Sequence, residues 1–374
     1  MLITIFFTNY GPYHLARIEA CNKLFKQLGW DIIGVEVSRL DSIYAWKTDS
    51  QNFPVPIISI FGEEKCEKIS FFQIFLKTFA TLSQLKPNVL AVAGYAEPAM
   101  LSSLIWSLWH RKRTVLFSDS KEDDAPRHWW SESLKTLLMM GYKAALVGGL
   151  THKRYLIKLG LPSDAIFLGY DVVANESFSP SKIKSCQNTI DKPYFLAVNR
   201  FVSKKNLLFL LSTYADYRQK LGTDAWDLVL CGDGELRPQI EQLIAKLNVQ
   251  DSIHLPGFLQ QYEMLPYFAH ASCFVHTSIQ EQWGLVVNEA MAAGLPVLVS
   301  NRCGCYEDLI IEGVNGFGFD PENSQQLIEL MLKMSSDDVN LKAMGQAALE
   351  HIQKFSPDYF AQGLKQAIEY ALSP

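Results

Sequence analysis

The sequence predicts an α/β protein made of two doubly wound parallel-sheet domains joined by a linker. Short apolar runs alternate with segments of helical periodicity throughout the 374 residues, as in parallel sheets covered by helices. This alternation stops at a polar stretch over residues 174–192, and a second alternating series then begins. The length also suits two domains of ordinary size.

The first predicted domain covers residues 1–180, and the linker follows over residues 181–192. Its first helix is predicted at His14–Leu28, because apolar residues recur at helical spacing and Gly29 is a common helix stop. These apolar residues are Leu15, Ile18, Ala20, Leu24 and Leu28. The predicted strands are Ile3–Phe7, Ile32–Val37, Val89–Val92, Thr114–Phe117, Ala144–Val147 and Ile166–Leu168.

The second predicted domain covers residues 193–356. A last helix within residues 357–374 is expected to pack back toward the first domain. The predicted strands are Tyr194–Val198, Asp227–Cys231, Ile253–Leu255, Cys273–His276, Val297–Ser300 and Gly316–Phe319. The predicted helices between them are Asn206–Leu221, Glu235–Leu247, Gln261–Ala269, Gly284–Ala293 and Ser324–Ser335. Ligands of such sheets bind beyond the carboxyl ends of the strands, so a cleft between the domains is the expected site.

Composition narrows the class of protein. The net charge of -5 gives no sign of a nucleic-acid partner, and seven scattered cysteines favour a reduced, intracellular protein. The apolar first residues lack a basic region and a cleavage site, and they are predicted to form a buried strand. No apolar run approaches the roughly 20 residues that span a bilayer. We therefore expect a soluble cytoplasmic protein, with peripheral attachment at the inner membrane face as the alternative.

The most informative segment contains two glutamates, Glu281 and Glu289, that flank seven residues. On a continuous helix their carboxylates would lie about 12 Å apart along the axis, a spacing that suits the two ends of an extended ligand. Gly284 stands where a helix start could offer free amides to a phosphate. The alternative is a plain amphipathic helix with solvated glutamates. That alternative leaves Gly284 and the exit through Gly294 and Pro296 unexplained.

The segment resembles the signature of glycosyltransferase family 4, which is E-x7-E followed by A-M-A-x-G-x-P-V. Further family segments follow in the family's order through most of the second half. They are Asn199–Asn206 for G-R-x4-K-G, Cys231–Leu236 for G-x-G-x-x-L, His254–Phe258 for F-x-G, Gly304–Glu307 for G-x-x-E and Gly313–Gly316 for G-x-x-G. The resemblance implies the GT-B fold, in which two Rossmann-like domains face a cleft.

The resemblance also implies the chemistry. A family member retains the anomeric configuration as it moves a sugar from a nucleoside-diphosphate sugar, UDP- or GDP-linked, to an acceptor hydroxyl. The acceptor would be a glycan, a lipid-linked molecule or a small molecule, and no other cofactor is expected. Glu289 would bind the ribose hydroxyls and Glu281 the donor sugar, while Arg200 and Lys205 would hold the diphosphate.

These roles agree with elementary electrostatics. Fixed cations and helix-start amides stabilise a leaving diphosphate without a metal ion. The chain has no Asp-x-Asp triplet, and Cys303 and Cys305 lack a second ligand pair, so no metal site is predicted. We expect these two thiols to pack beside the site. The other candidates for donor binding are Gly284, Leu285, Val286, Gly257, Phe258, Gly232 and Gly11.

The first half resembles the family more loosely. Gly169–Asp171 stands where the family has G-V-D, and the first loop has Gly11 as its single glycine. The family often has a histidine after the strand at Thr114–Phe117, whereas this chain has Ser118–Asp124. The candidates for the acceptor side are His14, Glu97, Asp119 and Lys121. His14 could equally be a helix-start residue, and Asp119 and Lys121 could equally belong to a solvated loop.

Two stretches, Leu101–Arg113 and Arg127–Lys143, combine tryptophan with basic residues. That pattern is typical of helices that lie on a membrane surface. The favoured interpretation is that both helices cover the first sheet and bury their apolar faces.

Three other functions stay open or are disfavoured. A nucleotide-sugar epimerase or hydrolase can share the two-domain architecture, and a non-catalytic binding protein could keep the fold. A dehydrogenase is disfavoured because the first loop lacks G-x-G-x-x-G.

Overall fold

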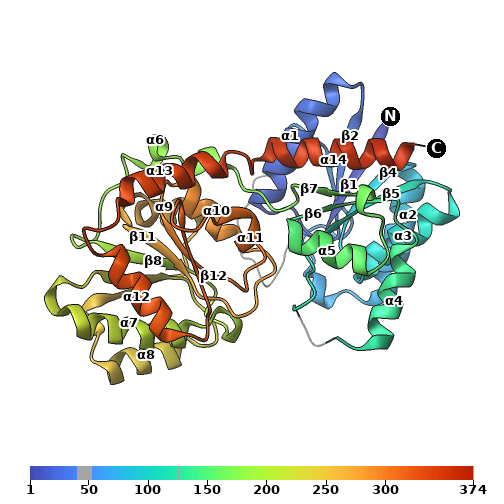
Figure 1. Cartoon of the computed structure of the whole chain (residues 1–374). Helices are drawn as coiled ribbons and strands as arrows, with labels where there is room; N and C mark the ends of the chain where they lie inside the picture. Colours follow the sequence, from blue (N-terminus) through green and yellow to red (C-terminus); the bar gives the residue numbers. More distant parts are fainter. Residues whose placement is uncertain (40–52, 125–126, 374) are drawn as a thin grey trace. The chain divides into compact units, whose positions relative to one another are not determined.

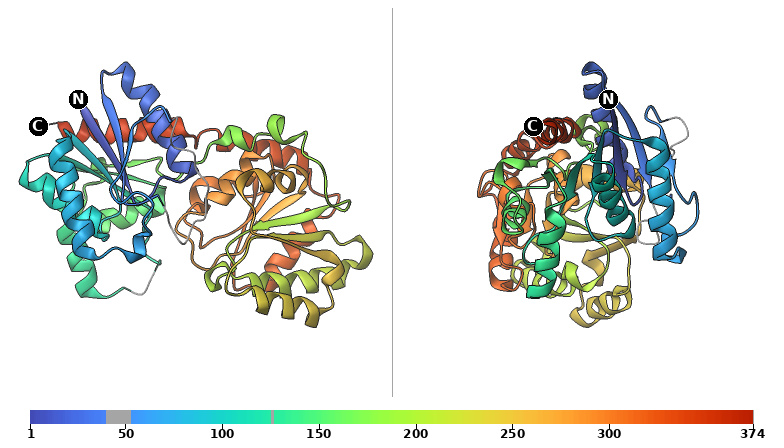
Figure 2. Two further views of the ribbon diagram at one scale, coloured as in Figure 1. Left: turned by 180° about the vertical axis from the view of Figure 1, so that it is seen from behind. Right: turned by 90° about the vertical axis from the view of Figure 1, so that its right-hand side faces the viewer.

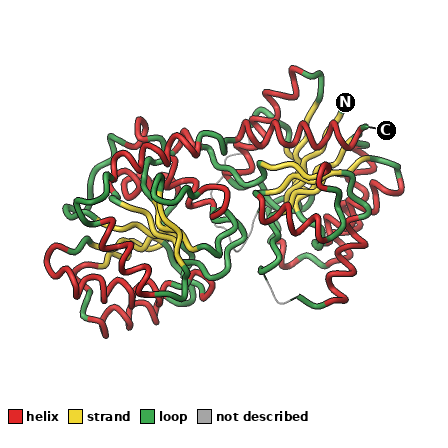
Figure 3. Tube along the Cα trace, viewed as in Figure 1, coloured by secondary structure: helices red, strands yellow, loops and turns green. Residues whose placement is uncertain are grey.

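The computed structural model describes residues 1–39, 53–124 and 127–373. The chain forms two compact units (Figure 1). The first unit is Met1–Val173 together with Phe355–Pro374, and the second unit is Ala174–Lys354. In each unit the strands lie inside a layer of helices, as the views in Figures 2 and 3 show.

The first unit contains a seven-stranded parallel sheet in the order β3-β2-β1-β4-β5-β6-β7. Its strands are β1 Leu2–Phe7, β2 Asp31–Glu36, β3 Ile57–Ser59, β4 Val89–Ala93, β5 Arg113–Ser118, β6 Ala144–Val147 and β7 Ile166–Leu168. Its helices are α1 Pro12–Gln27, α2 Phe71–Leu85, α3 Pro98–Trp109, α4 Trp129–Met139, α5 Leu150–Lys158 and α14 Pro357–Leu372. The sequence did not predict β3, α2 or α5. Helix α1 begins two residues before its predicted start, because proline fits the first helical turn.

Alternate side chains of the first sheet pack into two separate cores. Ile3, Ile5 and Phe7 of β1 belong to the core under α1 and α14. Phe6 belongs to the core on the opposite face, which includes buried residues of α2, α3 and α5. The expected packing of the C-terminal helix on the first unit is confirmed. A Cβ at Gly363 of α14 would lie 2.3 Å from the carbonyl oxygen of Leu168, so only glycine permits this close approach.

Helices α3 and α4 correct one expectation. Their inner sides bury Leu104, Trp106 and Met139 against the sheet, but Trp109 and Trp129 are 80% and 82% exposed. The prediction that these helices bury their apolar faces is therefore wrong for their outer sides. The reason is that apolar residues surround much of each helix, and a sheet covers only one side of it.

The second unit contains a six-stranded parallel sheet in the order β10-β9-β8-β11-β12-β13. Its strands are β8 Tyr194–Val198, β9 Asp227–Cys231, β10 Ile253–Gly257, β11 Cys273–His276, β12 Val297–Ser300 and β13 Gly316–Phe319. Its helices are α6 Pro180–Ile183, α7 Leu207–Leu221, α8 Arg237–Leu247, α9 Gln261–His270, α10 Leu285–Ala292, α11 Tyr306–Leu309, α12 Ser324–Met334 and α13 Leu341–Ile352. Helix α13 was not predicted. Helix α6, at the start of the stretch predicted as a linker, packs on α9.

Candidate active site

The strand order of the second sheet reverses beside β8. Strands β9 and β10 lie on one side of β8, and β11, β12 and β13 lie on the other. The loops that leave β8 and β11 diverge at such a point, which makes the carboxyl edge between them the usual ligand site of an open parallel sheet. Here the two loops are joined by hydrogen bonds. The Ile279 amide donates to the Lys204 carbonyl at 3.0 Å, and Thr277 Oγ1 donates to the Lys205 carbonyl at 3.0 Å.

A charged cluster joins the two loops at this edge. Lys205 Nζ forms an ion pair with Glu281 Oε2, and the two side chains are 13% and 12% exposed. The same carboxylate oxygen accepts a hydrogen bond from Ser278 Oγ at 3.0 Å and lies 3.1 Å from His276 Nε2. The cluster thus fixes one carboxylate oxygen by a cation, a hydroxyl and an imidazole.

The charge states in the cluster follow from its contacts. Burial favours the neutral form of Glu281, but the hydrogen bond from His276 and the charge of Lys205 outweigh burial and hold the pKa of Glu281 well below its ordinary 4.5. Burial lowers the pKa of His276, so its imidazole is neutral at pH 7. Glu281 is therefore an ionised hydrogen-bond acceptor at neutral pH, a form suited to binding hydroxyl groups.

Helix α10 begins beside this cluster. Gly284 is its N-cap residue and has φ of +104°, a conformation that L-residues rarely adopt. A Cβ at Gly284 would lie 3.4 Å from Glu281 Cγ and 3.5 Å from His276 Nε2, so any side chain would crowd the cluster. The amides of Leu285 and Val286 form the start of the helix, where backbone N–H groups lack intrahelical acceptors and favour anions.

The structure corrects the geometry expected for the two glutamates. Glu281 lies outside the helix, and its backbone forms an isolated parallel β-bridge with Cys303. Glu289 lies within α10 and is 2% exposed. The separation of about 12 Å assumed one continuous helix, which the backbone of Gly284 interrupts. Cys303 and Cys305 are buried, and a Cβ at Gly284 would lie 3.7 Å from Cys305 Sγ, so the thiol packs beside the site.

The glycines after β9 and β10 line the same edge of the sheet. The Gly232 amide donates to the Gly257 carbonyl at 2.8 Å. A Cβ at Gly232 would lie 1.8 Å from the carbonyl oxygen of Asn199, so the loops after β8 and β9 are in direct backbone contact. Arg200, next in the chain, is exposed, and Phe258 is 50% exposed after β10. The second unit thus brings together all the donor candidates except Gly11.

The remaining candidates lie in the first unit. Gly11 and His14 follow β1, and Glu97 follows β4. Strands β1 and β4 are neighbours at the point where the first sheet reverses its strand order. His14 Nδ1 accepts a hydrogen bond from the Gly11 amide at 3.3 Å, and its ring stacks on Phe7 with centroids 4.1 Å apart. Burial, and then the charge of Arg17, lower the pKa of His14 to about 3, so this imidazole is neutral at pH 7. The observed contacts are those of a helix-start residue.

The loop after β5 carries Asp119 and Lys121. Lys121 is buried, and its Nζ donates to Asp123 at 2.9 Å, so its charge is paired within the loop. Asp171 lies near this loop. Burial, and then the charge of Asp119, raise its pKa to about 7.

Sequence reasoning missed His276 and Ser278. A signal was available, because His276, Thr277 and Ser278 are three polar residues directly after the predicted strand Cys273–His276 or at its end. Polar residues at the carboxyl end of a parallel strand commonly face a ligand site.

Residues 181–351 match the family model described as glycosyl transferases group 1. The chain is 27% identical over 285 residues to sulfoquinovosyl transferase SQD2 of Arabidopsis thaliana, covering 72% of this chain and 52% of that protein. It is 26% identical over 214 residues to human α-1,3/1,6-mannosyltransferase ALG2, covering 54% of this chain and 51% of that protein. The chain thus spans about half the length of these relatives.

Solved structures match the fold over the whole chain. Anabaena HepE in complex with UDP and glucose has a TM-score of 0.77 at 17% identity, with 99% of each chain covered. A sucrose-phosphate synthase from Thermosynechococcus elongatus has a TM-score of 0.75 at 17% identity, with 98% of each chain covered. The chain has the GT-B fold, and residues 181–351 of its second unit are similar to group 1 glycosyltransferases.

Proposed function

We propose that the protein is a retaining glycosyltransferase that moves a sugar from a nucleoside-diphosphate sugar, UDP- or GDP-linked, to an acceptor hydroxyl without a metal ion. The observation that carries the proposal is the cluster of Lys205, Glu281 and His276 directly before the start of α10. The match of residues 181–351 to group 1 glycosyltransferases supports it, as does the likeness to relatives whose names describe sugar transfer.

The donor would lie along the carboxyl edge of the second sheet. Glu289, buried on α10, would accept hydrogen bonds from the ribose hydroxyls, and the ionised Glu281 would accept them from the sugar. Arg200, Lys205 and the amides of Leu285 and Val286 would surround the diphosphate. Negative charge on the diphosphate increases as the bond to the sugar breaks. The attraction between this charge and the fixed cations and amide dipoles would therefore be stronger in the transition state than in the bound donor.

In the proposed reaction the bond between the anomeric carbon and the phosphate oxygen breaks, and its electron pair goes to the nucleoside diphosphate. The acceptor oxygen bonds to the same carbon from the same face. Its proton passes to the leaving phosphate oxygen, so no protein side chain has to act as the base. The role of Lys205 in this reaction is to stabilise the negative charge that accumulates on the diphosphate.

The first experiment measures thermal stabilisation of the full chain by UDP, GDP and other nucleoside diphosphates, in EDTA and in added magnesium. We expect one diphosphate to raise the melting temperature by several degrees in EDTA. Glu289→Gln should lose this shift. The matched control is Glu329→Gln on α12, which changes an exposed glutamate of the same unit outside the proposed site. A shift that requires magnesium would refute metal independence, and no shift with any diphosphate would refute the donor site.

The second experiment follows the sugar. With the matching nucleotide sugar and an acceptor panel, product NMR should show a new glycosidic bond with the anomeric configuration of the donor. Consumption of the donor that gives only an epimer or free sugar, with every acceptor, would instead identify the epimerase or hydrolase alternative. An inverted product would refute retention.

A further inference from the structure

The outer sides of three helices in the first unit expose an unusual amount of apolar surface. Among the described residues, 20 large hydrophobic side chains are prominently exposed, and 11 of these belong to α2, α3, α4 or the residue after α4. They are Phe71, Phe72, Leu76, Ile105, Leu108, Trp109, Trp129, Trp130, Leu134, Leu137 and Met140. Monomeric soluble proteins rarely leave so many large apolar side chains together in water, so this surface indicates a binding partner.

The three helices form one continuous layer on the same face of the first sheet (Figure 1). Ser102 Oγ of α3 donates to the Phe75 carbonyl of α2 at 2.7 Å. A Cβ at Gly141, just after α4, would lie 2.8 Å from a methyl carbon of Leu104, so α4 packs on α3 as well. We call the outer side of this layer the basic apolar face.

Charge identifies the kind of partner. Residues 71–113 and 127–143 contain eight lysines and arginines and two glutamates, although the whole chain has a net charge of -5. Two of the eight cations, Arg127 and Lys135, pair with Glu132, which leaves six cations and one glutamate in these segments. Arg111, Lys112 and Arg113 follow the end of α3 at Trp109, after the single residue His110. Tryptophans and basic residues around an apolar surface are the combination found where proteins meet anionic lipid headgroups.

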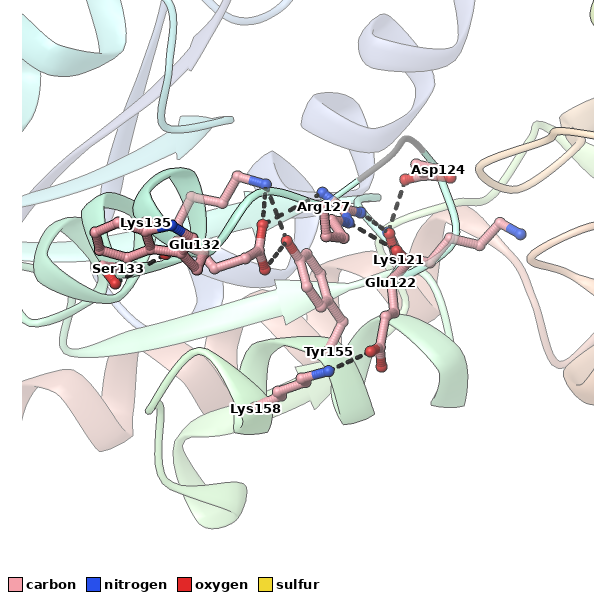
Figure 4. A network of polar contacts seen from close by, with 10 residues as sticks. Lys121, Glu122, Asp124, Arg127, Glu132, Ser133, Lys135, Tyr155 and Lys158 are labelled. Atoms are coloured by element: carbon pink, nitrogen blue, oxygen red, sulfur yellow. Dashed lines mark hydrogen bonds and ion pairs between the residues drawn. The ribbon is translucent and has the colours of Figure 1, made fainter.

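A network of polar contacts holds α4 against α5 (Figure 4). Glu132 accepts hydrogen bonds from Lys135 Nζ at 2.7 Å and from Tyr155 Oη of α5 at 2.9 Å. The guanidinium of Arg127 lies 4.6 Å from the centroid of the Tyr155 ring and 3.7 Å from Glu132. The polar side of α4 is therefore occupied within the fold, while Trp130, Leu134 and Leu137 stay exposed on the other side.

We propose that the basic apolar face binds the surface of an anionic lipid bilayer, with its tryptophans in the headgroup region and its cations against the lipid phosphates. In the described residues no helix is long and apolar enough to cross a membrane. The proposed contact is thus peripheral, and it is independent of the donor site in the second unit.

The test is sedimentation of the full chain with vesicles. One set contains phosphatidylcholine alone, and the other contains about one third phosphatidylglycerol. We expect binding to the anionic vesicles at low salt and much weaker binding to neutral vesicles or at high salt. The triple variant Trp109→Ser, Trp129→Ser, Trp130→Ser should bind at least about tenfold more weakly. Its control, Tyr262→Ser, Ile311→Ser, Val314→Ser, removes three exposed apolar side chains from the second unit and should bind like the wild type.

A second variant tests the charges. Arg111→Asn with Lys112→Gln should weaken binding to anionic vesicles by about thirtyfold, from the usual contribution of two cations near a membrane. Asparagine suits position 111 because φ there is +53°. The control is Lys220→Gln with Lys246→Gln, which removes two exposed lysines from the second unit.

Three results of the vesicle experiments would overturn the proposal. They are no sedimentation with anionic vesicles, equal binding to both vesicle types, and equal binding by the variants and their controls. A dimer in analytical ultracentrifugation that the tryptophan variant abolishes would show that a second copy covers the face instead. Circular dichroism and the melting temperature verify that each variant is folded. This control does not depend on the donor site, so failure of the donor-site proposal leaves the vesicle result interpretable.

Discussion

Replacing Lys205 with methionine tests how the charged cluster is held. The substitution keeps a long apolar stem but leaves the Glu281 carboxylate buried without its cation. Removing one partner of a buried ion pair usually costs about 3–5 kcal/mol. Glu281 still accepts a hydrogen bond from Ser278 and contacts His276. We therefore expect the free energy of unfolding of the second unit to fall by about 2–3 kcal/mol at pH 7.

The double variant Lys205→Met, Glu281→Gln separates this loss from other effects of the methionine. It removes both charges and leaves an amide that Ser278 can still contact. Because the buried carboxylate is gone, the double variant should recover most of the lost stability. It should recover none of the proposed transferase activity, since both groups would act on the donor.

The stability difference should also depend on pH in a defined direction. The folded pKa of Glu281 lies below its ordinary 4.5, so its stabilising contribution is full above that pH and is lost as the pH falls toward the folded pKa. Lys205→Met removes one of the two main causes of the lowered pKa. The difference in free energy of unfolding between wild type and Lys205→Met should therefore be about 1 kcal/mol smaller at about pH 4 than at pH 7.

The measurement is urea unfolding of the full chain, monitored by hydrogen exchange in peptides from residues 273–300, which reports on the second unit alone. A Lys205→Met variant within about 0.5 kcal/mol of the wild type at pH 7 would refute the reasoning. A stability difference between wild type and variant that grows in acid would also refute it, because the pKa of Glu281 would then not be lowered by Lys205.

Three further predictions concern single residues. Glu289→Gln should weaken binding of the matching nucleoside diphosphate by about 10- to 100-fold in calorimetry, because hydrogen bonds to a charged acceptor are lost, and unchanged affinity would contradict the ribose assignment. The free energy of unfolding of the first unit should fall by about 2–4 kcal/mol as the pH rises from about 4 to about 7. The reason is that folding raises the pKa of Asp171 from 3.8 to about 7, so the folded state binds this proton more tightly than the unfolded state does. Asp171→Asn should flatten that slope in urea titrations, and an unchanged slope would assign it to another group. Gly363→Ala should lower the melting temperature and speed hydrogen exchange in α14, since its methyl group would overlap the Leu168 carbonyl, whereas a neutral effect would mean that α14 is loosely attached.

The sequence predicted the strands of both sheets well because buried parallel strands are continuous apolar runs between polar turns. Tyr194–Val198 and Asp227–Cys231 were predicted with the bounds that the structure shows. Helices outside those clear signals were missed. Helix α13 is an example, since Gly345 interrupts its apolar pattern. In the structure a Cβ at Gly345 would lie 2.1 Å from the Gly294 carbonyl oxygen, so this glycine permits close packing.

The contacts within the candidate site could not be predicted in the same way. Periodicity predicted a helix from Gly284 to Ala293, but it gave no position for Glu281, which the positive φ of Gly284 separates from α10. The link between Lys205 and Glu281 depends on β8 lying beside β11, and local periodicity carries no information about strand order. His276 becomes a site residue only through that neighbour relation, which brings its ring within 3.1 Å of Glu281.

The basic apolar face shows a different limit of the same reasoning. Trp106 and Trp109 lie one helical turn apart on α3, yet they are 1% and 80% exposed. Periodicity identifies apolar positions, but it cannot state which of them the rest of the chain covers, because burial depends on packing between elements distant in sequence. Trp106 is buried and its Nε1 donates to Ser83 Oγ of α2 at 3.0 Å, whereas Trp109 is left in water. Since such exposure is costly in a large patch, the tryptophans on the outer side of this layer are better explained by a contact outside the folded unit than by the fold itself.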